Sequence, residues 1–230
     1  MFNSNSIFFE SLSLSIPVDE NAIVKIYDHA SNKEIKCGEN ALLSQFSSGG
    51  VNWNSPVHKN SLGKIGIKRN GFVINSTDEE HQGMRISPCF SVNNAQNTIS
   101  VYIEKFWQNF PKAILKQNDL INVALFPEGT FELQGGEKKS HTMWIDFKSN
   151  HQNFDWVDKP LNVTLDPKYL ELTGAIEYFQ SNLKEDNLSE IIEKGITGAN
   201  NFFEKREIVD EYGWRNFGDL YADHETEGFQ

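Results

Sequence analysis

The chain has 230 residues, of which 38% are hydrophobic and 23% charged, so it is long enough for one large β domain or two smaller domains and is not intrinsically disordered. Its 21 basic and 32 acidic residues give a net charge of −11, which argues against nucleic acid or an anionic membrane as the main partner. No apolar run reaches about 18 residues, so the sequence predicts no membrane span.

The cysteines and the N-terminus give little chemical information. Cys37 and Cys89 form neither a metal-type pair nor a disulfide framework. The first residues lack a basic region, and the apolar run after them is too short for a signal peptide. We therefore expect no export signal in this chain, which favours a cytoplasmic location.

Residues 7–147 are predicted to form β-strands. Apolar and polar residues alternate along 11–18, 99–104 and 141–147. This period of two is typical of strands with one buried face. Many short strands at such spacing favour an antiparallel, supersandwich-like β-sandwich over residues 1–150.

Two glycine-containing turns support this prediction. Asn70-Gly71 lies between two short apolar runs, and Gly135-Gly136 separates two further strand-like runs. Such dipeptides supply the positive φ angles that two-residue hairpin turns require. Each of them therefore predicts a β-hairpin.

Helical patterns begin after a polar linker at residues 151–165. Asp166 can cap a helix that starts at Pro167, and an apolar stripe follows at Tyr169, Leu172, Ile176, Phe179 and Leu183. Asn187 and Glu190 have capping-box spacing, and a second stripe follows at Leu188, Ile191, Ile192, Ile196, Ala199, Phe202 and Phe203. We expect residues 166–230 to contain an antiparallel helical pair joined near 184–186, which makes the fold class α+β and mostly β. The two apolar faces need cover from the sandwich or from further helices.

The sequence predicts no metal site and no cofactor. The glycines at 63, 66 and 71 lie in a predicted hairpin rather than between a strand and a helix, so they do not indicate a dinucleotide site. The acidic run at 78–81 favours a solvated turn, because adjacent residues rarely converge on one ion. His224-Glu225 begins like a zinc-protease helix, but no second histidine follows at the required spacing.

The polar loop at residues 47–58 is a first candidate for ligand binding. It contains Trp53 and His58 among serines, asparagines and glycines. One interpretation is a long connection held by side-chain hydrogen bonds, and the other is a wall of a sugar groove. The sequence leaves both open.

Residues 136–141 are a second candidate. Lys138, Lys139 and His141 open a predicted strand. A charged hairpin edge is the simpler interpretation, and recognition of a carboxylate by the lysine pair is the alternative.

The segment at residues 214–225 is the strongest candidate for chemistry. It places Trp214, Arg215, Tyr221 and His224 among carboxylates and aromatic rings. Internal pairing of Arg215 with nearby aspartates would explain it structurally. We favour function, because a guanidinium, a phenol and an imidazole together can neutralise an acid, remove a proton and return one.

Four segments together resemble the exo-rhamnogalacturonan lyase family of polysaccharide lyases. They run in order through most of the chain: SSGGVNWNSP (47–56), FWQNFPKA (106–113), ELQGGEKKSHT (132–142) and YGWRNFGDLYADHE (212–225). Val51 departs from the acidic residue expected in the first segment. The resemblance implies β domains followed by an (α/α) toroid that degrades pectin of the rhamnogalacturonan type by β-elimination. It identifies this chain as the central β-sandwich plus the start of the toroid.

The implied chemistry assigns roles to these candidates. Arg215 would stabilise the charge that develops on a uronic acid, while His224 and Tyr221 would act as base and acid. Trp53, His58, Lys138, Lys139, His141 and Trp214 would bind a substrate that contains galacturonate and rhamnose. Residues 166–230 hold only part of a toroid, so activity of the isolated chain is left open and further domains are expected partners. A non-catalytic carbohydrate-binding or structural β-sandwich is the alternative.

Overall fold

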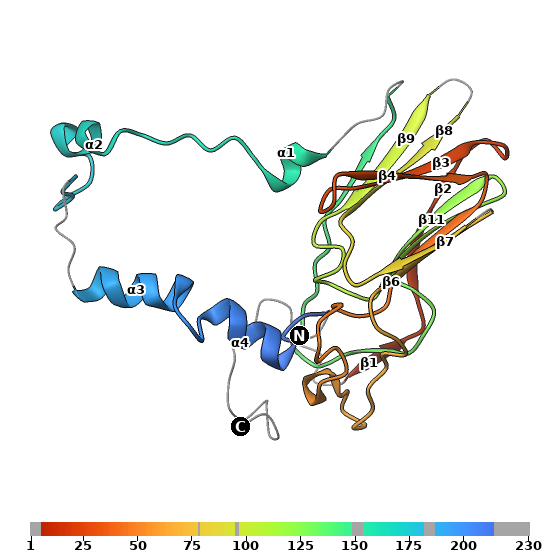
Figure 1. Ribbon diagram of the computed structural model, residues 1–230, viewed down its shortest axis with the longest axis horizontal. Coiled ribbons are helices and arrows are strands. Elements are labelled where there is room, and N and C mark those ends of the chain that lie inside the picture. The colour runs from red at the N-terminus through yellow and green to blue at the C-terminus, as the bar shows by residue number, and fades with distance from the viewer. Residues whose placement is uncertain (1–5, 78, 95–96, 149–153, 182–186, 214–230) are drawn as a thin grey trace.

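Two antiparallel sheets make up most of this protein and lie face to face (Figure 1). The computed structural model describes residues 6–77, 79–94, 97–148, 154–181 and 187–213. Within these residues the structure is mostly β, with α-helices confined to the C-terminal third. The predicted antiparallel, sandwich-like architecture is therefore confirmed at this level.

The strands follow a fixed order in each sheet. The six-stranded sheet consists, in spatial order, of β2 (Leu12–Pro17), β11 (Leu120–Phe126), β10 (Lys112–Gln117), β5 (Ala41–Gln45), β6 (Phe72–Ser76) and β7 (Glu80–Gly83). The five-stranded sheet consists of β13 (Met143–Asp146), β9 (Thr98–Ile103), β8 (Pro88–Asn93), β3 (Ile23–Asp28) and β4 (Lys33–Gly38). A separate pair joins β1 (Ile7–Phe9) to β12 (Phe131–Leu133).

The core lies between the two sheets. Val24 and Ile26 of β3 are fully buried, and Lys25 between them is only half-buried, as expected for a strand with one inner face. Leu43 and Ile114 contribute from the opposite sheet to the same cluster. The predicted alternation holds on β9 and β13, where Val101 and Ile145 belong to this cluster or pack against it, whereas Leu12 and Leu14 of β2 are exposed.

The outer face of the five-stranded sheet is also covered. The Phe154 ring stacks on Tyr102 at 5.6 Å, and Trp156 of α1 (Asp155–Asp158) meets Trp144 of β13 at 4.9 Å. This contact explains why every residue of β9 is buried, not only alternate ones. Cys89 lies beneath it as a free thiol, and burial raises its pKa to about 11.

Both predicted hairpins are wrong. Asn70-Gly71 does not join two paired strands, because β6 pairs with β5 and β7, and the preceding run makes a single bridge, Lys59 to Ile65. Gly71 serves close packing instead: a Cβ there would lie 2.0 Å from a backbone oxygen of Gly83. At Gly135-Gly136 the preceding strand β12 pairs with β1 from the N-terminus, not with β13.

The helices start where the sequence predicts and end earlier. α2 (Pro167–Thr173) is capped by Asp166, whose side chain accepts from the Lys168 N–H, and it ends at Gly174 with φ +61°. α3 (Asn187–Thr197) is followed by a break and then by α4 (Phe202–Val209), for which Asn201 caps two N–H groups. The second apolar stripe is therefore split over two helices. The predicted joint at 184–186 falls outside the described residues.

α2 and α3 form an arm that extends away from the sheets (Figure 1). Figure 1 shows the chain leaving the sandwich after α1 and returning to it at α4. Side chains of the predicted stripes are exposed along the arm, with Leu172 at 86% and Ile191 at 66%. None of the described helices is both long and apolar enough to cross a membrane.

Removing the same side chain from the core and from the arm should have very different effects. We expect Leu43→Ala to lower the free energy of unfolding by about 2–5 kcal/mol, because it leaves a cavity in a packed interior. Leu172→Ala should change it by no more than about 0.5 kcal/mol, since that side chain is exposed. Denaturant titration of both variants provides the measurement, and equal losses would contradict the exposed arm.

Candidate functional site

Hydrogen bonds from its serine side chains hold the loop that follows β5 in place. The Ser47 hydroxyl donates to Asn70 Oδ1 at 2.7 Å and accepts the Gly71 N–H at 2.9 Å. Gly49 takes φ +75°, and a Cβ there would lie 2.1 Å from the Met84 carbonyl oxygen. Only glycine allows the backbone at position 49 to lie this close to Met84. Local packing and hydrogen bonds therefore explain Ser47 and Gly49 of the Ser-Ser-Gly-Gly run.

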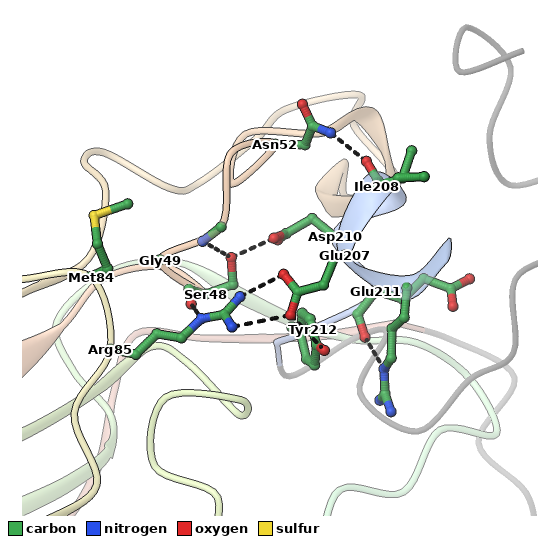
Figure 2. A network of polar contacts seen from close by, with 12 residues as sticks. Ser48, Gly49, Asn52, Met84, Arg85, Glu207, Ile208, Asp210, Glu211 and Tyr212 are labelled. Carbon is green, nitrogen blue, oxygen red and sulfur yellow. Dashed lines mark hydrogen bonds and ion pairs between the residues drawn. The ribbon is translucent and has the colours of Figure 1, made fainter. Parts of the chain in front are cut away.

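Asp210, immediately after α4, anchors the helix to this loop. Its carboxylate is buried and accepts a hydrogen bond from the Ser48 hydroxyl (Figure 2). Its second oxygen lies 2.7 Å from Nε2 of His58, at the end of the short helix η1 (Pro56–His58). A buried carboxylate needs such partners, because it has lost its water.

Arg85 forms the second anchor. Its guanidinium binds Glu207 of α4 through two hydrogen bonds of 3.1 and 2.7 Å, and its Nε donates to the Ser48 carbonyl at 2.8 Å (Figure 2). The same group lies 4.1 Å from the centre of the Trp107 ring. A planar cation suits both contacts, since arginine pairs bidentately with carboxylates and stacks on aromatic faces.

Ser48, His58 and Asp210 do not form a catalytic triad. In a triad the histidine lies between serine and aspartate and takes the serine proton. Here Asp210 lies in the middle and accepts from Ser48 directly. The cluster therefore joins the helix to the sandwich and does not activate a nucleophile.

Residues 212–213 continue the docking along the sandwich. The Tyr212 ring packs 5.1 Å from Trp107, and its hydroxyl donates to Glu207 at 3.1 Å. Burial and the neighbouring Glu207 raise the pKa of Tyr212 to about 12, so the phenol stays neutral. The Gly213 N–H donates to the Gln108 carbonyl at 2.7 Å, and the Gly213 carbonyl accepts from Lys139 at 3.3 Å.

A cavity of about 470 Å³ lies beside His58; we call it the His58 cavity. Three aromatic rings contribute to its lining, together with charged and amide side chains: Phe46, Phe110, Phe131, Asn60, Lys64, Lys68, Glu128 and Glu132. The His58 ring meets Phe110 edge-on at 5.3 Å. This volume is within the range of about 300–1,000 Å³ typical of small-ligand sites.

A smaller cavity of about 330 Å³ lies on the side of Lys139; we call it the Lys139 cavity. Lys139 and His141 line it together with mainly apolar residues: Phe9, Ser11, Leu12, Phe126 and Leu133. The His141 ring packs edge-on against Phe126 at 5.2 Å, and its Nδ1 lies 3.0 Å from Asn109 Nδ2.

Burial controls the charge around the Lys139 cavity. The Lys112 ammonium donates to the carbonyls of Asn109 at 2.6 Å and Leu125 at 3.0 Å, yet burial lowers the pKa of Lys112 to about 7, helped by Lys139. Burial also lowers the pKa of His141 to about 3, with Lys112 and Lys139 adding to the effect. His141 is therefore neutral at pH 7 and does not act as a cation toward a ligand.

The structure brings some of the predicted site residues together and separates others. His58 lines one cavity, while Lys139 and His141 line the other. Trp53 is half-buried in its loop and Lys138 is exposed, and neither lines either cavity. Trp214, Arg215, Tyr221 and His224 lie outside the described residues, so their roles stay predictions.

Several residues at this location were not predicted as site residues: Arg85, Glu207, Asp210 and Lys112. Arg85 and Glu207 are 122 positions apart, and no local pattern predicts such a pair. Lys64 and Lys68 were not predicted as site residues either.

Comparison with models of known protein families gives no match, and comparison with curated protein sequences gives none either. Function must therefore be argued from the residues and their geometry.

Replacing the Arg85 guanidinium should loosen α4. We expect Arg85→Lys to lower the free energy of unfolding by about 1–2 kcal/mol, because an ammonium cannot keep both the bidentate pair and the stacking on Trp107. Arg69→Lys is the matched control, since Arg69 is exposed and contacts only Phe46 and Gln82 at longer range among the contacts described. Denaturant unfolding compares the two, and an equal loss would contradict the anchor.

The low pKa of His141 makes the fold sensitive to acid. In the unfolded chain this histidine takes up a proton below about pH 6.5, whereas in the fold it stays neutral down to about pH 3. The unfolded state therefore gains protons first, and stability falls as the pH drops through this window. His141→Gln should reduce the loss of unfolding free energy between pH 7 and pH 4.5, and Lys139→Met should raise the His141 pKa measured by NMR titration. An unchanged pH profile in His141→Gln would contradict this assignment.

Proposed function

We propose that this chain is a portion of a polysaccharide lyase that acts on rhamnogalacturonan-type pectin by β-elimination. One observation supports the proposal: among the described residues, the first three segments of the resemblance contact the stretch at 210–213, which leads into the last segment, although they are far apart in sequence. Ser48 of the first segment contacts the anchor that leads into the last, and Gln108 and Lys139 of the second and third both bind Gly213.

The geometry around Gly213 supports a site at this location. A Cβ on Gly213 would lie 2.8 Å from the Phe110 ring, and Phe110 lines the His58 cavity. Lys139, which binds the Gly213 carbonyl, lines the other cavity. The residues proposed for catalysis, Arg215, Tyr221 and His224, follow Gly213 in the sequence by 2 to 11 positions.

The chemistry assigns one task to each proposed residue. The proton next to a uronate carboxylate is removed while negative charge grows on the acid, so a cation there lowers the barrier. Arg215 supplies the cation in this proposal, His224 takes the proton, and Tyr221 protonates the leaving oxygen. The (α/α) toroid that completes such a site is part of the proposal.

The His58 cavity favours a second candidate, a non-catalytic carbohydrate-binding domain. Aromatic rings beside charged and amide groups suit sugars, whose faces are apolar and whose hydroxyls are polar. This candidate needs no residue beyond Gly213.

A cleavage assay separates the two candidates. Incubation of a full-length version that includes the toroid with rhamnogalacturonan should give the ultraviolet absorbance of an unsaturated uronate, and Arg215→Ala in that version should reduce its rate at least 100-fold. Arg69→Ala is the control for loss of an arginine. Retardation in affinity electrophoresis on the same polymer without any unsaturated product would support the binding domain and contradict the lyase.

A further inference from the structure

The loop at residues 58–68 contributes much of the lining of the His58 cavity, and hydrogen bonds fix its conformation. Asn60 folds it by accepting the N–H groups of Leu62 and Lys64 at 3.0 and 2.9 Å. Lys59 and Ile65 then form a bridge. Residues 64–68 all line the cavity, with Ile65, Gly66 and Ile67 between the two lysines.

Charges around the cavity are balanced. Lys64 and Lys68 contribute two ammonium groups, and Glu128 and Glu132 contribute two carboxylates. Glu132 is buried and accepts the Ser61 N–H at 2.9 Å, so this side chain is held beside the loop. A bound carboxylate would meet both signs, whereas a hydroxyl can donate to a carboxylate and accept from an ammonium.

The apolar part of the lining is also suited to a sugar ring. Phe110 and Phe131 lie in the same cavity as Ile65 and Ile67. Such side chains can cover the C–H face of a sugar while the polar groups hold its rim. An ion as strongly hydrated as a free uronate gains less from this surface.

We propose that the His58 cavity binds a neutral sugar unit, with Lys64, Lys68, Glu128 and Glu132 as partners of its hydroxyls. This inference rests on the proposed function in that the ligand is a saccharide, and it deepens that function by assigning one cavity to a neutral rather than an acidic unit. The His58 ring belongs to both the cavity lining and the α4 anchor, because it also contacts Asp210.

The cavity contains a natural position for a blocking substitution. Gly66 lines the cavity, a Cβ added to it meets nothing within 4 Å, and its φ is not in the left-handed region, so the backbone accepts a large side chain at this position without strain. Leu62→Phe is the matched control, because it puts the same ring on the same loop at a side chain that is 65% exposed and does not line the cavity.

The test is an NMR titration of the full chain with three probes: methyl rhamnoside and methyl galactoside as neutral sugars, and sodium galacturonate as the acid. We expect a neutral glycoside to shift the amide signals of Ser61, Gly66 and Thr130, with a Kd at least tenfold lower than that of galacturonate. Gly66→Phe should raise the Kd at least tenfold, and Leu62→Phe should leave it unchanged. Circular dichroism and the unfolding midpoint check that both variants are folded.

The inference would be overturned if galacturonate bound as tightly as the neutral glycosides. It would also be overturned if Gly66→Phe left binding of the neutral glycosides unchanged, or if none of the three probes bound. The outcome is separable from that of the cleavage assay. Cleavage of rhamnogalacturonan without binding of a neutral sugar would contradict only the assignment of the His58 cavity. Binding of a neutral sugar without any unsaturated product would support that assignment and contradict the lyase.

Discussion

The arrangement of the C-terminal part depends on one buried carboxylate. Asp210 has no access to water, and its charge is stabilised by the Ser48 hydroxyl and the His58 ring. Ser48 lies in the loop after β5, and His58 lies at the end of η1, so a single side chain fixes two loops and the end of α4. Removing it would leave buried polar partners unpaired, which generally costs more than the bonds themselves contribute.

Local features were predictable from the sequence, and long-range pairings were not. The cap at Asp166 depends on neighbouring residues and is found in the structure. The segment at 11–18 does form a strand, but Leu12 and Leu14 are exposed, so its predicted buried face is limited to Ile16. The Gly135-Gly136 hairpin was wrong because β12 finds its partner at the N-terminus, which no turn signal encodes. Glycine turn signals also arise from close backbone approach, as at Gly71.

In the candidate site too, residue type was predictable from the sequence and long-range contacts were not. Lys139 and His141 were predicted from residue type, and they do line a cavity. Residue type alone did not predict that burial beside Lys112 keeps His141 neutral. Arg85 carried no signal at all, since its importance comes from Trp107 and Glu207, which only folding brings together. Charge and burial at a site depend on tertiary contacts, which a sequence pattern does not contain.

The helical arm is tied to the sandwich at both ends, by Phe154 and Trp156 before it and by α4 after it. Covalent linkage thus holds α4 at a high effective concentration near its docking loop. A protease cut within the arm would turn this intramolecular contact into an encounter between two separate fragments. Whether such a nicked protein stays together at a given dilution then measures how tightly α4 binds the sandwich by itself.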